Sequence, residues 1–501
     1  MKMGRLKKAY LSSFAAGLYQ IVSVVCSLIV PRLILIEYGS VYNGAISSIT
    51  QFLDFISVLQ IGIQGATRVA LYKAFANNDH DSVSGIIKAN QKYYRLVSYF
   101  LILYIIVLSG ILPFIISEEI SRYDVFWLVI IIGFSNFLQY FFGNVYKALL
   151  SADQASYIIS VFETITLLLS TLMISILIIN GNSILLAKFG SSLIYSLNPI
   201  ALFLFVNRKY KFNKNAMENR DALKNRWDVL ANSAANIIHE KVDVFFITLF
   251  CNTKEVSVYA VYNLVSMGII KCINVIISGT EAAFGDMWAK KERELLKQNF
   301  KKYEFTVFAI TSVLVSCTQA LIIPFVSIYT SGITDVEYIR PIFSFVIVVA
   351  LATYCIRLPY VTLVQAAGFY KETKIGSYVE AFLNFTLTFV LVIRQGITGA
   401  VIATAFANVF RSLQYGFFTY SNIIQVKYYE MVKRVLWLLG TMIVSMVCDQ
   451  ILLGNIIISA WMNWIISAGA VFVLNVMVAI ISSLLFYRDD LMMMMKRIKR
   501  G

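Results

Sequence analysis

The sequence predicts an all-α polytopic membrane protein of about 14 transmembrane helices, built as two parallel-repeat six-helix lobes plus two C-terminal helices. Three observations lead to this fold class. About 59% of the residues are hydrophobic, and they form blocks long enough to cross a bilayer, which takes about 20 mainly apolar residues. Basic residues gather in alternate connections between these blocks, and the second half of the chain repeats features of the first.

The distribution of Lys and Arg predicts the orientation of the blocks. Of the 43 basic residues, 33 fall in eight segments: 1–8, 68–95, 147–155, 207–228, 285–303, 366–375, 421–434 and 488–501. The opposite connections, near 37–42, 118–123, 181–183, 252–256, 329–340, 394–397 and 450–456, hold only Arg122, Lys254, Arg340 and Arg394. By the positive-inside bias, both termini are expected to be cytoplasmic. The net charge of +15 is therefore a signal of topology and anionic lipid, and no nucleic-acid partner is expected.

The elements follow one another in a regular order. The first apolar run continues to Ile36 without a clear cleavage site, so it is expected to be a retained helix and not a signal peptide. We expect an N-terminal six-helix lobe at 1–206, a basic cytoplasmic linker at 207–228 and a C-terminal six-helix lobe at 229–421. Two additional helices at 435–486 and a basic cytoplasmic tail at 487–501 complete the chain.

Short echoes at a nearly constant offset support the duplication. The tripeptide at 40–42, Ser-Val-Tyr, recurs at 257–259, and Leu-Pro-Phe-Ile at 112–115 is matched by Ile-Pro-Phe-Val at 323–326. Glu163 and Glu380 also follow similar Ser-Tyr pairs. A repeat of six spans begins on the same side of the membrane each time, and substrates of such parallel repeats are handled at the repeat interface.

Polar residues three or four positions apart form stripes on the first two spans of each repeat. Such residues share one helix face, and they are costly in lipid unless they face a cavity or another helix. The members of these stripes that we select as candidates are Gln20, Asp54, Gln60, Gln64, Arg68, Asn236, Glu240, Asp243, Lys271 and Asn274.

Charges near the middle of a span are the most informative of these polar residues. Arg357 lies at such a depth, as do Asp54, Glu240, Lys241 and Lys271, whereas Arg32 is nearer the outside. Lys241 is given a lesser role because it lies off the polar stripe of its span. They imply water, mutual pairing or an anionic ligand. The alternative to a functional role is internal pairing, for example of Glu240 or Asp243 with Lys271. Glu163 and Glu380 are expected to cap helices or pair near the inner surface.

Other chemistries lack the residues they require. The sequence shows no phosphate-binding glycine loop, no HExxH motif and no Cys/His cluster, so no ATP, metal or other cofactor is expected, and no catalytic residue is assigned. A membrane-embedded polymerase or glycosyltransferase would need a sizeable outer loop, and a scaffold would not need charges at mid-bilayer. We therefore expect a transporter and not an enzyme.

The chain resembles the polysaccharide flippases (Wzx-like) of the multidrug/oligosaccharidyl-lipid/polysaccharide exporter superfamily. The likeness rests on Pro31-Arg32, Glu37-Tyr38-Gly39 and Tyr42-Asn43-Gly44, followed by an amphipathic second span with Gly62. In the second half it rests on 242–259, on Gln365-Ala366-Ala367-Gly368 and on Lys371. The resemblance implies movement of an undecaprenyl-diphosphate-linked oligosaccharide from the inner to the outer leaflet by alternating access, during assembly of capsule, O-antigen or exopolysaccharide.

The resemblance also suggests roles for the candidate residues. Arg32, Arg68, Lys271 and Arg357 would contact the diphosphate, because charge-assisted hydrogen bonds favour phosphate oxygens. The amides Gln20, Gln60, Gln64, Asn236 and Asn274 would meet sugar hydroxyls. Asp54, Glu240 and Asp243 would serve in charge pairing or in coupling to protons or sodium ions.

The setting implied by the resemblance is the bacterial plasma membrane. The partners implied there are membrane lipids, a glycan polymerase and glycosyltransferases. Two other functions stay open within the superfamily: a peptidoglycan-precursor flippase and an ion-coupled multidrug antiporter. The antiporters commonly rely on an acid in the first span, and none lies between Tyr10 and Ile36.

Overall fold

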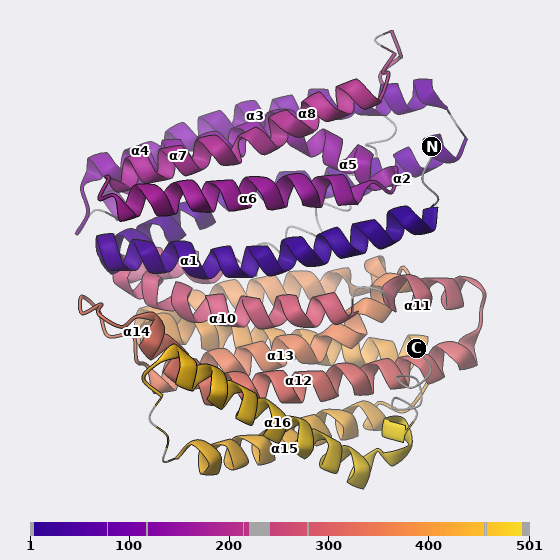
Figure 1. Ribbon diagram of the computed structural model, residues 1–501. Helices are drawn as coiled ribbons and strands as arrows, with labels where there is room; N and C mark the ends of the chain where they lie inside the picture. The colour runs from indigo at the N-terminus through magenta and orange to yellow at the C-terminus, as the bar shows by residue number, and fades with distance from the viewer. Residues whose placement is uncertain are drawn as a thin grey trace. The chain divides into compact units, whose positions relative to one another are not determined.

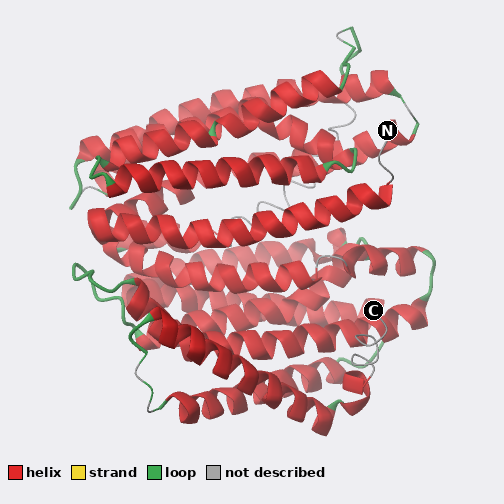
Figure 2. Ribbon diagram, viewed as in Figure 1, coloured by secondary structure: helices red, strands yellow, loops and turns green. Residues whose placement is uncertain are grey.

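The computed structural model describes residues 5–77, 79–116, 119–213, 215–219, 241–277, 280–454, 456 and 458–492. Within these ranges the regular structure is helical throughout (Figure 2), which confirms the all-α class. Eleven stretches are long and apolar enough to cross a membrane. The protein is therefore a multi-pass membrane protein.

Two of these stretches each contain two spans. Helix α1 (Arg5–Asp54) has 50 residues and α14 (Tyr370–Phe418) has 49. At about 1.5 Å per residue, each would be more than twice as long as the roughly 30 Å hydrocarbon layer is thick. Each is broken by a glycine of positive φ, Gly39 at 81° and Gly396 at 58°. Counting both as pairs gives 13 spans within the described residues. The helical residues 241–250 lie where the sequence predicts part of a further span.

The chain divides into two compact units, residues 1–257 and 258–501. After α1, the helices of the first unit are α2 (Ser57–Ala76), α3 (His80–Ile115), α4 (Arg122–Leu138), η1 (Gln139–Gly143), α5 (Asn144–Ala152), α6 (Ser156–Ile179), α7 (Ile184–Tyr195) and α8 (Leu197–Lys209). Helix α6 packs against α1 and α7, and α3 packs against α4 (Figure 1). Their buried faces form one continuous apolar core.

The connections of the first unit meet in two groups, at opposite ends of its helices. At one end Asp153 accepts a hydrogen bond from Tyr210 at 2.6 Å and pairs with Lys8 at 3.2 Å. Burial, and then this contact with Asp153, raises the pKa of the Tyr210 phenol. At the other end Lys254 pairs with Glu119 at 2.6 Å. The first group comes from segments rich in basic residues and the second from poor ones, which agrees with the alternation in the sequence.

Helix α3 begins at a sequence-encoded cap. The Asp79 carboxylate accepts hydrogen bonds from the Ser82 hydroxyl at 2.6 Å and from the Ser82 backbone N–H at 2.8 Å. An N-cap carboxylate of this kind satisfies a donor that the helix itself leaves open. The same two hydrogen bonds, the hydroxyl's first, lower the pKa of Asp79.

The second unit contains most of α10 (Thr253–Ile277), then α11 (Thr280–Ala289), α12 (Arg293–Tyr329), α13 (Pro341–Ala366), α14, η3 (Thr419–Ile423), α15 (Tyr429–Leu453) and α16 (Trp461–Phe486). Helix α13 packs against α12 and α14, and α12 also packs against α15 and α16 (Figure 1). The two additional C-terminal helices therefore join the second unit through α12.

A buried charge cluster fastens α15 to α12. Glu304 of α12 is fully buried and lies 3.4 Å from the Arg434 guanidinium of α15. Arg434 also donates to the Lys301 carbonyl at 2.6 Å and pairs with Asp490 at 3.1 Å, while the Tyr420 hydroxyl donates to Glu304 at 2.6 Å. The attachment of the C-terminal helices thus includes compensated buried charges as well as apolar packing.

Candidate functional site

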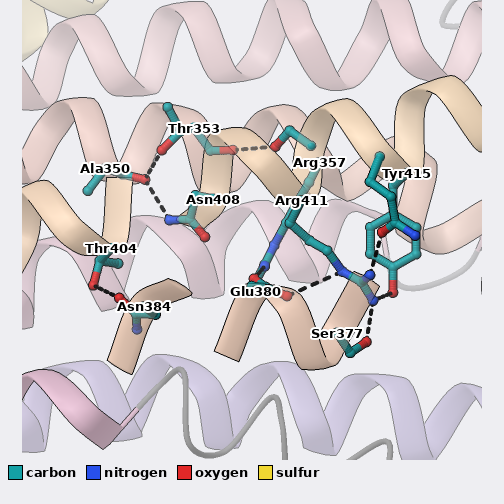
Figure 3. Close-up of polar contacts among 12 residues, drawn as sticks. Ala350, Thr353, Arg357, Ser377, Glu380, Asn384, Thr404, Asn408, Arg411 and Tyr415 are labelled. Carbon is teal, nitrogen blue, oxygen red and sulfur yellow. Dashed lines mark hydrogen bonds and ion pairs between the residues drawn. The ribbon is translucent and has the colours of Figure 1, made fainter. Parts of the chain in front are cut away.

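The best-defined charged site in the described part of the second unit joins three spans through one carboxylate. Arg357 of α13 donates to the Glu380 Oε1 at 2.7 Å, and Arg411 lies 3.2 Å from the Glu380 Oε2 (Figure 3). Glu380 precedes the Gly396 break in α14, and Arg411 follows it. Because two guanidinium groups share one carboxylate, the trio carries an excess positive charge inside the membrane-spanning region.

The two arginines are held very differently. Arg411 is 1% exposed, and its guanidinium donates to the Thr373 carbonyl at 3.0 Å and to the Tyr415 hydroxyl at 2.6 Å. Ser377 and Gln414 accept further hydrogen bonds from it. These acceptors all come from α14, so the two halves of that helix enclose the guanidinium.

Arg357 is less enclosed. Its side chain is 13% exposed, and its guanidinium donates a hydrogen bond to Glu380. The guanidinium also lies over the Tyr354 ring, 4.4 Å from the centroid, which is a cation–π distance. The described contacts of Arg357 are therefore fewer than those of Arg411.

A line of buried amides and hydroxyls continues from the arginine site along the same spans (Figure 3). Asn408 donates to the Ala350 carbonyl at 3.4 Å, and Thr404 donates to the Asn384 Oδ1 at 3.3 Å. Asn384 is fully buried and Asn408 nearly so. Polar groups at this depth are kept only when they are hydrogen-bonded or serve a polar ligand.

The first unit contains a second line of polar contacts, between residues 43–54 and 241–257. Asp54 pairs with Lys241 at 3.0 Å, and the Ser48 and Thr248 hydroxyls lie 2.7 Å apart. Asn43 donates to the Ser257 hydroxyl at 2.7 Å. As the residue numbers of the first segment rise, those of their partners in the second segment fall, so the two segments run antiparallel. We refer to these three contacts as the polar seam.

The backbones along this seam approach closely at Gly44. A Cβ atom at this position would lie 1.8 Å from the Thr253 carbonyl oxygen, well inside van der Waals contact. The approach is possible because glycine has no Cβ atom. Gly44 belongs to the Tyr-Asn-Gly motif at 42–44 that carries part of the family resemblance.

A further ion pair lies between the fourth and fifth spans of the first unit. Lys147 of α5 donates to Glu163 of α6 at 2.7 Å, and both side chains are about a quarter exposed. Glu163 and Glu380 occupy matching places in the sequence repeat, and each pairs with a basic residue of the span before it. Both acids were expected to cap helices or to pair near the inner surface. Glu380 does so as a 1% exposed side chain ten residues into α14.

The candidate residues of the sequence occupy several environments. Arg357 lies in the arginine site and Asp54 in the polar seam. Asp243 is buried and lies two residues after Lys241, a member of the seam. Gln20 and Arg32 on α1, Gln60 on α2 and Lys271 on α10 are half-buried, whereas Arg68 on α2 and Asn274 on α10 are exposed. Gln64 lies within α2, and Asn236 and Glu240 lie outside the described residues.

Sequence reasoning missed Arg411 and assigned Lys241 a lesser role because it lies off the polar stripe of its span. Arg411 follows a polar spacing that the sequence does show, with Thr404 and Asn408 seven and three positions before it. That spacing places the three side chains on one helix face. This spacing could have predicted a polar stripe on the twelfth span.

Comparison with known proteins identifies structures of similar fold. The sequence matches no protein-family model and no curated protein. Among solved structures, "Lipid II flippase MurJ, inward closed conformation" is similar with a TM-score of 0.72 and 14% identity, over 96% of this chain and 99% of that one.

A MATE transporter and a further MOP superfamily transporter are similar as well. A single-site mutant of the Vibrio cholerae MATE transporter VcmN matches with a TM-score of 0.60 and 14% identity, over 85% of this chain and 97% of that one. A MOP superfamily transporter from Pyrococcus furiosus matches with a TM-score of 0.61 and 13% identity, over 84% and 96%. The chain therefore has the fold of the MOP superfamily of transporters and flippases, as its resemblance to polysaccharide flippases predicted.

Proposed function

We propose that the protein is a flippase that moves undecaprenyl-diphosphate-linked oligosaccharides from the inner to the outer leaflet by alternating access, for assembly of a surface polysaccharide. The observation that carries the proposal is the excess positive charge of Arg357, Arg411 and Glu380 in the interior of the second unit. Insertion scales put the cost of one charge at mid-bilayer at about 2.5–3.5 kcal/mol. A chain that keeps a net cation there gains when an anionic ligand binds.

A diphosphate headgroup is the anion that suits these side chains. Arginine presents a planar fork of donors that matches phosphate oxygens, and it keeps its charge. We assign the diphosphate to Arg357, together with Arg32, Arg68 and Lys271 from the sequence stripes. The amides Gln20, Gln60, Gln64, Asn236 and Asn274 are assigned to the sugar. Asp54, Glu240 and Asp243 are assigned to charge pairing or ion coupling.

The extent of the structural match favours a lipid-linked substrate over a drug. The lipid II flippase matches 96% of this chain, whereas the Vibrio and Pyrococcus transporters leave about 15% unmatched. The same match favours a second candidate, a flippase for the peptidoglycan precursor. The two candidates share the diphosphate and differ in the sugar, so they call for the same cations and different amides.

A reconstituted transport assay tests the proposal. Proteoliposomes that contain only this protein are given a fluorescent polyprenyl-diphosphate oligosaccharide or fluorescent lipid II, and outer-leaflet appearance is followed. We expect transport of the oligosaccharide lipid that is lost in the Arg357→Ala, Lys271→Ala double variant. Arg394→Ala is the matched control, because Arg394 is an exposed arginine near the end of the first half of α14.

Each outcome of this assay separates the candidates. Faster transport of lipid II than of the oligosaccharide lipid would favour the precursor flippase. Transport of neither lipid, with an ion gradient and a voltage applied, would refute the proposal and make drug or cation exchange the next assay. Collapse of transport by a proton or sodium ionophore would identify the coupling ion.

The cellular setting follows from the same proposal. The protein would lie in the bacterial plasma membrane with both termini in the cytoplasm. Glycosyltransferases would supply its substrate and a glycan polymerase would consume its product. Cysteine labelling of residues in the 285–303 connection from the inside, and of the 329–340 connection from the outside, tests this orientation.

A further inference from the structure

The Glu380 carboxylate holds two arginines with unequal strength, and this asymmetry has a functional consequence. Arg411 is enclosed by four acceptors besides Glu380, whereas Arg357 contacts Glu380 and one neighbour on its own helix, Tyr354. Movement of Arg357 would therefore break its ion pair with Glu380 and change its contact with Tyr354, while movement of Arg411 would break five contacts. Arg357 is the arginine that can exchange its partner.

Exchange at Arg357 would leave no orphaned charge behind. A buried carboxylate that loses its only cation is strongly destabilised. Glu380 would keep Arg411 at 3.2 Å, so its charge would stay compensated when Arg357 turned to another anion. Arg411 thus lowers the free-energy cost of separating Arg357 from Glu380.

The first unit provides the contrasting case. The described ion pair of Glu163 is with Lys147 alone, at 2.7 Å. If Lys147 left, Glu163 would lose that compensation. The two repeats therefore carry equivalent pairs, of which the one at Glu380 has the second cation that exchange requires.

We propose that Glu380 is an exchangeable counter-ion that competes with a phosphate group of the substrate for Arg357, and that Arg411 is a positioning residue that retains Glu380 during the exchange. The inference rests on the proposed function and adds a release step to it. In the empty state Arg357 pairs with Glu380. In the loaded state Arg357 donates to a phosphate oxygen, and the return of Glu380 to Arg357 displaces the phosphate at the opposite leaflet. The recognised chemistry is a diphosphate ester.

The competition predicts opposite effects from two neighbouring substitutions. Glu380→Gln removes the competitor, so diphosphate binding should become tighter by about tenfold, the factor that corresponds to about 1.4 kcal/mol. Because release then slows, turnover should fall while the apparent KM falls as well. Arg411→Gln removes one of the two described cations of Glu380, which then holds Arg357 more tightly, so diphosphate binding should weaken. The double variant Arg411→Gln, Glu380→Gln should regain affinity.

Binding to the purified full-length protein in micelles provides the test. The probes are undecaprenyl diphosphate, undecaprenyl monophosphate and inorganic pyrophosphate, and the readout is native mass spectrometry with a parallel thermal unfolding curve. Binding of the diphosphate lipid but not of pyrophosphate identifies the lipid headgroup as the source of the anion. The matched control is Glu163→Gln, which neutralises the equivalent acid of the first unit and should leave affinity unchanged.

The outcomes distinguish this inference from the proposed function. Wild-type protein that binds none of the three probes contradicts both. Wild-type protein that binds and flips the diphosphate lipid, with affinity unchanged or lowered in folded Glu380→Gln, overturns the exchange alone. If Glu380→Gln does not fold, the decision falls to Arg411→Gln: weakened binding supports the exchange, and unchanged or tighter binding overturns it.

Discussion

Removal of the Arg434 side chain should destabilise the second unit more than any change on its surface. The Arg434→Met variant leaves the Glu304 carboxylate fully buried without its cation and breaks the contacts of Arg434 with the Lys301 carbonyl and with Asp490. Breaking one partner of a buried ion pair costs about 3–5 kcal/mol. We expect a value near the lower end, about 3 kcal/mol, because the Tyr420 hydroxyl still donates to Glu304 at 2.6 Å.

A double-mutant cycle gives the decisive comparison. Replacing both Arg434 and Glu304 by Met removes the pair together, so most of the lost stability should return. The assay is unfolding of the purified protein in mixed micelles, followed by circular dichroism. Lys290→Met is the control, since Lys290 forms an exposed pair with Asp286 and its loss should leave the curve unchanged. A double variant as unstable as Arg434→Met would show that the lost stability does not come from the uncompensated Glu304 charge.

Three further predictions concern the first unit. Gly44→Ala should impair folding or expression, because its Cβ would lie 1.8 Å from the Thr253 carbonyl oxygen. The control Gly110→Ala lies in open space on α3 and should be neutral or stabilise the protein by up to about 1 kcal/mol. Detergent-solubilised yield and melting temperature report both effects. Asp79→Ala should speed hydrogen exchange in the first turn of α3. Folding lowers the pKa of Asp79, so the stability contributed by the wild-type cap is present above the unfolded-state pKa of about 3.9 and is lost as the pH falls through the folded-state pKa. Equal exchange rates of the two proteins at neutral pH would therefore contradict the capping role. Tyr42→Phe should lower the free energy of unfolding by about 1 kcal/mol, since it removes a 2.6 Å hydrogen bond to the Asp124 carboxylate. An unchanged unfolding midpoint would show that this bond does not contribute to stability.

The number and class of the helices could be predicted from sequence because lipid imposes them. Each span must satisfy its own backbone hydrogen bonds and present about 20 apolar residues, so hydropathy alone marks it. The reversals near residues 37–42 and 394–397 were predicted too, from the gaps between apolar blocks. The structure adds their cause, the positive φ of Gly39 and Gly396.

The candidate site could be predicted only in part, because sequence locates a charge along a span but not its partner on another. Arg357 was recognised by its depth. Arg411 was missed because nothing in its own span shows that Glu380 lies 3.2 Å away, across the Gly396 break. Lys241 was ranked low by its helix face, yet it pairs with Asp54 across 187 residues of sequence. Partner choice is decided by packing, which one sequence does not encode in its local pattern.

The polar seam between residues 43–54 and 241–257 has an energetic character unlike that of the cluster at Arg434. Its members are a partly exposed ion pair, a hydroxyl pair and an amide–hydroxyl bond. The two neutral hydrogen bonds are worth about 0.5–1.5 kcal/mol each and the partly exposed ion pair about 0–1 kcal/mol, so together they contribute about 1–4 kcal/mol. A fastening of that strength is undone spontaneously in a small fraction of molecules at any instant. The seam is thus strong enough to set a resting arrangement and weak enough to come apart and re-form many times without unfolding the helices it joins.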